Sequence, residues 1–211
     1  MNQPLLDLIA FAAGAIAVVV DRRRAVFVAC LAVAVGLAPA AAIYGGGWAA
    51  VVVLGAGLAG AVAGPLAGLV ARRMSPRPGL DPLHPVGARQ EGLFGPRSAR
   101  VAAGVIALIA ASWVSFNVPV GSVTAVQGAL FPAAFVFTCG VLRVFLARTV
   151  TDLSVGMAAI ALAIGVAWLL RGGSGPLPDV AGIVAIVPVV GAVEGWLAAR
   201  HRSPASSEPR P

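Results

Sequence analysis

The chain has 211 residues, of which 59% are hydrophobic and 11% are charged, and its mean hydropathy is +0.95. A soluble globular domain carries about 25% charged residues, so this composition excludes a water-soluble fold and indicates a protein whose surface faces lipid. The net charge of +7 comes from fifteen arginines at the ends of apolar runs, a pattern typical of membrane topology signals and not of a nucleic-acid-binding surface. Because lysine is absent, mechanisms that need a lysine Schiff base are excluded too.

Seven apolar stretches are long enough to cross the hydrocarbon core of a bilayer, which takes about 20 helical residues. In chain order they cover about 4–20, 25–43, 48–71, 101–118, 123–146, 152–171 and 180–199. The second and third are joined by Tyr44-Gly45-Gly46-Gly47-Trp48, which is typical of a tight turn with aromatic side chains at a membrane interface. The sequence therefore predicts an all-α, polytopic membrane protein with about seven transmembrane helices.

The arginines also predict the orientation of these helices. With the N-terminus outside, fourteen arginines fall on the inner side and Arg171 alone on the outer side, as the positive-inside rule requires. The predicted organisation is transmembrane helices 1–3 in residues 1–71, a cytoplasmic Arg/Pro-rich loop in 72–100, helices 4–7 in 101–199 and a cytoplasmic tail in 200–211. The richness in Ala, Gly and Arg suggests a GC-rich bacterial source, so we expect a multi-pass protein of the bacterial cytoplasmic membrane.

Three glycines in the third predicted span recur every four residues, at Gly60, Gly64 and Gly68. This spacing leaves one helix face without side chains, so that a neighbouring backbone can approach closely. The alternative is that the spacing reflects general abundance, since the chain has 26 glycines.

Charged residues inside the predicted spans are the best candidates for function, because burying a charge at the centre of a membrane helix costs roughly 2.5 to 3.5 kcal/mol. Glu194 lies six residues before Arg200 and Arg143 lies five residues before Arg148, on predicted helices that run in the same direction. The two side chains should therefore lie at similar depth, where they could form an intramembrane charge pair. The alternative is that both reach the cytoplasmic interface separately.

Two further carboxylates are weaker candidates. Asp7 lies early in the first span, where a hydrated helix end competes with a proton site as the interpretation. Asp152 lies where the sixth span begins, and there a carboxylate stabilises the helix dipole. The sequence shows no catalytic motif, no metal-binding spacing and no cofactor-binding motif, so we expect no metal, no cofactor and no catalytic site of its own.

Short motifs and the order of spans resemble hydrogenase-4 component E, a membrane subunit of formate-hydrogenlyase-type complexes related to small subunits of complex I and of multisubunit cation antiporters. The motifs are Leu93-Phe94-Gly95-Pro96 before the fourth span, and Arg148 followed by Val155-Gly156-Met157 at the junction of the fifth and sixth. Such subunits are expected to carry acidic residues within their sixth and seventh spans. Here those spans have Asp152 and Glu194 near their ends instead.

The resemblance implies a non-catalytic integral membrane subunit of a hydrogenase-like or cation-antiporter-like complex, with the lipid bilayer and other membrane subunits as partners. The departure in acidic residues favours a structural or coupling role over proton relay through this subunit. The alternative function is a small-solute or ion transporter that acts on its own, with its site between helices.

Overall fold

The computed structural model describes residues 3–19, 25–74, 96–118, 130–147, 150–170 and 176–200, and this part of the chain is helical and contains no strand. The helices are α1 (Gln3–Val19), α2 (Ala25–Met74), α3 (Pro96–Asn117), α4 (Leu130–Phe145), α5 (Val150–Leu170), α6 (Pro176–Val184) and α7 (Ile186–Arg200). The predicted all-α class is therefore confirmed for the described residues.

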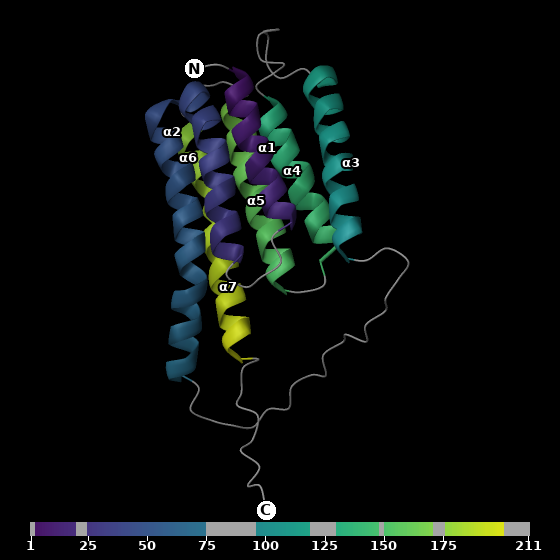
Figure 1. Cartoon of the computed structure of the whole chain (residues 1–211). Coiled ribbons are helices and arrows are strands. Elements are labelled where there is room, and N and C mark those ends of the chain that lie inside the picture. The colour runs from purple at the N-terminus through teal and green to yellow at the C-terminus, as the bar shows by residue number, and fades with distance from the viewer. Residues whose placement is uncertain are drawn as a thin grey trace, which may run out of the picture.

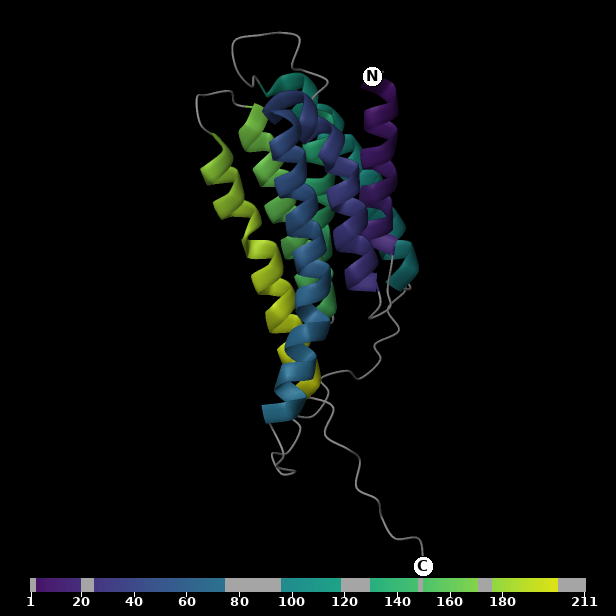
Figure 2. The same ribbon diagram turned by 90° about the vertical axis from the view of Figure 1, so that its left-hand side faces the viewer.

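The helices lie side by side in an elongated bundle (Figure 1). α3 lies at one edge against α4, whereas α2 and α7 pack extensively against each other on the other side. Gln3, where α1 begins, and Arg200, where α7 ends, lie at opposite ends of the bundle. At the end that is lower in Figures 1 and 2, α2 and α7 extend beyond the other helices.

α2 folds back on itself at Gly46, as the glycine-rich turn in the sequence predicted. Its apolar part, Val28–Ala71, has 44 residues, and at about 1.5 Å per residue an unbroken helix of this length would be about twice as long as the hydrocarbon core is thick. Gly46 has φ 77° and ψ 177°, a conformation that is open to glycine and strained for other residues. The first arm, residues 25–45, therefore runs beside the second arm, residues 47–74 (Figure 2).

The last predicted span is divided between α6 and α7 at Ala185. Proline has no amide hydrogen, so Pro188 cannot donate to the carbonyl of Val184, where α6 ends. The amide of Ala185 still donates to the carbonyl of Ala181 at 2.9 Å, so the helical path continues up to the break. The two helices together form one apolar stretch, Pro178–Leu197, of 20 residues.

Helical residues are described at both ends of the predicted loop 72–100. α2 extends to Met74 and α3 begins at Pro96, so helices enter the predicted loop 72–100 from both sides, and proline suits the first position of α3. α4, Leu130–Phe145, lies within the fifth predicted span, about 123–146. Residues 75–95, 119–129 and the tail 201–211 lie outside the described part of the chain.

Three helical stretches are long and apolar enough to cross a membrane: Val28–Ala71, Val150–Leu170 and Pro178–Leu197. α3 and α4 contain shorter apolar segments, Val101–Asn117 and Leu130–Phe145. The helices thus suit a membrane, and the count of seven spans and their orientation stay predictions.

The core of the bundle is built mostly from small side chains. Alanine and valine dominate the buried residues, and the largest fully buried side chains are Phe135, Leu37 and Leu162. Small side chains allow close packing of helices in lipid, where dispersion contacts replace the hydrophobic effect as the main attraction. Large apolar side chains such as Leu58, Ile109 and Phe116 point outward, as expected of a surface that faces hydrocarbon.

Candidate functional site

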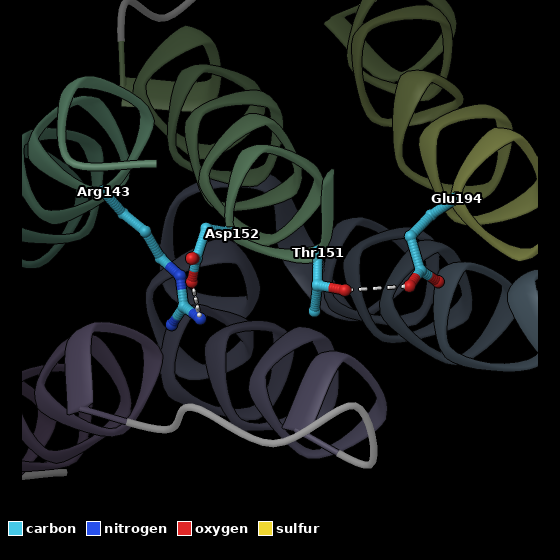
Figure 3. A network of polar contacts seen from close by, with 4 residues as sticks. All are labelled: Arg143, Thr151, Asp152 and Glu194. Atoms are coloured by element: carbon cyan, nitrogen blue, oxygen red, sulfur yellow. Dashed lines mark hydrogen bonds and ion pairs between the residues drawn. The ribbon is translucent and has the colours of Figure 1, made fainter. Parts of the chain in front are cut away.

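Four polar side chains from three helices meet where α4 ends and α5 begins, at the end of the bundle that is lower in Figure 1 (Figure 3). They are Arg143 on α4, Thr151 and Asp152 on α5, and Glu194 on α7. We refer to these four residues as the polar cluster.

Arg143 and Asp152 form a buried ion pair in which Nη2 of the guanidinium lies 2.9 Å from Oδ1 of the carboxylate. Each side chain is 5% exposed. Arg143 lies in the last turn of α4 and Asp152 in the first turn of α5, so each charge is also stabilised by the dipole of its own helix. The two opposite charges cancel, so the buried pair carries no net charge. The pair joins α4 to α5.

Thr151 joins α5 to α7. Its hydroxyl Oγ1 donates a hydrogen bond to Oε1 of Glu194 at 3.1 Å, and the contact is partly buried. Successive residues of an α-helix point about 100° apart, so Thr151 and Asp152 reach different neighbours from the same turn. The first turn of α5 thereby contacts the guanidinium of Arg143 on one side and the carboxylate of Glu194 on the other.

The second oxygen of Glu194 lies over α2. A Cβ added to Gly64 would lie 3.4 Å from Oε2 of Glu194, so the glycine leaves room for the carboxylate. Cys30, a buried free thiol, lies on the first arm of α2. The second arm of α2 therefore borders the polar cluster at Glu194.

Glycines from α2 and α7 form a close contact beside the cluster, which we call the glycine seam. It comprises Gly60, Gly64 and Gly68 on α2, and Gly191 and Gly195 on α7. A Cβ on Gly64 would lie 3.2 Å from the carbonyl oxygen of Gly191, and a Cβ on Gly68 would lie 3.3 Å from that of Gly195. In the other direction, a Cβ on Gly195 would collide with the carbonyl oxygen of Gly64. The two backbones are thus in direct contact.

Arg143 and Glu194, proposed from the sequence as one charge pair, lie on either side of α5, and each has a partner on that helix (Figure 3). Asp152, treated in the sequence as a helix-end carboxylate, is the partner of Arg143. Asp7 belongs to α1, and its side chain lies outside the described part of the structure.

Thr151, Gly191 and Gly195 were not singled out from the sequence. The four-residue spacing of Gly191 and Gly195 around Glu194 was a usable signal, because it matches the spacing of the glycines on α2. Nothing comparable marked Thr151, whose hydroxyl is one of many in the chain.

The four side chains of the polar cluster can form hydrogen bonds and ion pairs that hold neighbouring helices together. Among the described residues, no group of three or more His, Cys, Asp or Glu side chains could hold a metal ion. The cluster combines one guanidinium, two carboxylates and one hydroxyl, which can bind one another across helix boundaries. No family model, no curated protein and no solved structure matches the chain.

Proposed function

We propose that the chain is a non-catalytic integral membrane subunit of a hydrogenase-like or cation-antiporter-like complex. The observation that carries this proposal is the polar cluster, in which Arg143 binds Asp152 and Thr151 binds Glu194. These side chains bind within the chain and brace three helices against one another. Such bracing suits a protein whose role is to hold a defined shape beside its partners.

α3 supports the proposal, because it packs on one side only. It lies at the edge of the bundle and contacts α4 and, less extensively, α1 (Figure 1). Its other side carries exposed large apolar residues: Val101, Val105, Ile106, Leu108, Ile109, Trp113 and Phe116. A helix at an edge with this composition suits contact with lipid or with the helices of another membrane subunit.

In the proposed topology the seven spans predicted from the sequence cross a bacterial cytoplasmic membrane. The N-terminus lies outside, and the lower end of the bundle, with Arg73 and Arg200, lies at the cytoplasmic surface. Arg73 is exposed at the end of α2, where an arginine can contact anionic headgroups.

The test is copurification of the affinity-tagged full chain from its native membrane in mild detergent. We expect a stable assembly heavier than the 21.0 kDa chain, with other membrane subunits identified by mass spectrometry. A chain that carries Ile109→Asn on the exposed face of α3 should lose partners, whereas Leu58→Asn on the outer face of α2 serves as the matched control. Isolation of the native chain as a single species would contradict the proposal.

The alternative, a transporter that acts on its own, is favoured by one observation. Arg143 and Asp152 are ionised groups inside a membrane-type bundle, and such groups often line ion or substrate pathways. Flux of protons or small ions through liposomes that contain the purified chain alone, lost in Asp152→Asn, would support the transporter and exclude the subunit role.

A further inference from the structure

Two helix pairs at the lower end of the bundle are each held together by direct backbone contact. The second arm of α2 and α7 meet along the glycine seam. α4 and α5 meet at Gly140 and Gly156, where a Cβ on either glycine would lie 2.9 Å from the carbonyl oxygen of the other. The ion pair between Arg143 and Asp152 fastens the same two helices. Neither pair can separate without losing close contacts along its length.

Prolines interrupt both helices of the first pair. Pro65 lies within α2 beside Gly64 of the seam, and Pro188 lies at the start of α7, just after the break at Ala185. Each proline removes one backbone hydrogen bond, to the carbonyls of Ala61 and Val184 respectively, which lowers the resistance of a helix to bending.

At this end a polar contact joins the two pairs. The Thr151 hydroxyl of the α4–α5 pair donates to the Glu194 carboxylate of the α2–α7 pair at 3.1 Å. Glu194 is partly exposed. The lower ends of α2 and α7 extend beyond α5 (Figures 1 and 2). A single hydrogen bond between a hydroxyl and a carboxylate is easier to exchange for water than a backbone seam is to open.

We propose that α7 and the part of α2 that it contacts along the glycine seam move together as one arm, which bends at Pro188 on α7 and above Gly60 on α2 and is latched to α5 by the hydrogen bond from Thr151 to Glu194. Opening would expose the space between α5 and α7 at this end of the bundle while the glycine seam and the Arg143–Asp152 ion pair stay closed. This inference concerns the fold itself and does not rest on the proposed subunit role.

The experiment measures distances between spin labels in the full-length chain, with Cys30 and Cys139 replaced by alanine. One label pair, at Leu69 and Leu153, spans the latch, and a second pair, at Leu69 and Val193, lies within the arm; all three positions are exposed. In Thr151→Val we expect the open population across the latch to rise about fivefold, the factor expected for loss of about one net hydrogen bond. The distance within the arm should stay unchanged.

Thr151→Ser keeps the hydroxyl and should restore the native distribution across the latch. Broadening of both label pairs in Thr151→Val would show a general loss of packing and overturn the proposal, and so would no change in either. If the chain without Cys30 and Cys139 does not fold, hydrogen exchange tests the same proposal in a chain that keeps both cysteines. Thr151→Val should then speed exchange in 61–74 and 186–200 and leave 130–147 unaltered, whereas equal acceleration in all three segments would refute the arm.

Discussion

Thr151 and Asp152 are adjacent in the chain, yet they bind side chains from opposite neighbours. Asp152 accepts a hydrogen bond from Arg143 of α4, and Thr151 donates one to Glu194 of α7. The first turn of α5 is therefore the junction at which three helices are joined by polar contacts (Figure 3). Because these contacts differ in charge and burial, changes to them should have different consequences.

The buried ion pair should be costly to break from one side and much less costly to replace as a whole. Asp152→Leu leaves the Arg143 guanidinium buried without its carboxylate, which we expect to cost about 3–5 kcal/mol of stability. The double change Arg143→Leu with Asp152→Leu removes both charges and should lose less than Asp152→Leu alone. Thermal unfolding of the native chain, Arg143→Leu, Asp152→Leu and the double variant in one detergent measures the effects, and additive losses would show that the pair is not coupled.

The sequence could predict that Arg143 and Glu194 lie at a similar depth but not how they are paired. Depth along a helix follows from residue counts, because each residue adds a fixed rise. The direction in which a side chain points relative to other helices depends on helix rotation and packing, which depth does not determine. Asp152 was accordingly assigned to a helix dipole, although the structure shows it bound to Arg143 as well.

The glycine seam should not tolerate even one methyl group at its centre. In Gly195→Ala the added Cβ would collide with the carbonyl oxygen of Gly64, so α2 and α7 would have to separate. We expect a loss of about 1–3 kcal/mol, typical of overpacking. Gly182→Ala on α6 is the matched control, because a Cβ there has no atom within 4 Å and alanine favours helix. Thermal unfolding of both variants checks this, and equal stability would argue against the close contact.

The sequence predicted one face for Gly60, Gly64 and Gly68 but not the helix that covers it. Four-residue spacing places residues on the same side of any helix, so the pattern is informative about a face. Which helix covers that face depends on how the whole chain folds back. In the structure it is α7, separated from α2 by more than 100 residues of sequence.

The turn of α2 should depend on one glycine and not on its neighbour. Gly46 has φ 77°, whereas Gly47 does not have positive φ, and a Cβ on either would meet no atom within 4 Å. Gly46→Ala should therefore cost about 1–3 kcal/mol through backbone strain alone, and Gly47→Ala should cost less. The thermal stabilities of Gly46→Ala and Gly47→Ala, measured under identical conditions, separate the cost of backbone strain from the cost of altered packing. A larger loss in Gly47→Ala would be inconsistent with the observed turn.

The orientation of the bundle can be tested from two sites that the proposed topology places on opposite sides of the membrane. The turn at Gly46 and the end of α7 at Arg200 lie at opposite ends of the bundle (Figure 1). A single cysteine at Gly47, which is exposed in the turn, should react with a membrane-impermeant maleimide added outside intact cells. A cysteine introduced at Ser203 should react only after the membrane is opened, because the arginine excess predicts a cytoplasmic C-terminus. Labelling of both sites in intact cells, or of Ser203 alone, would contradict the predicted topology.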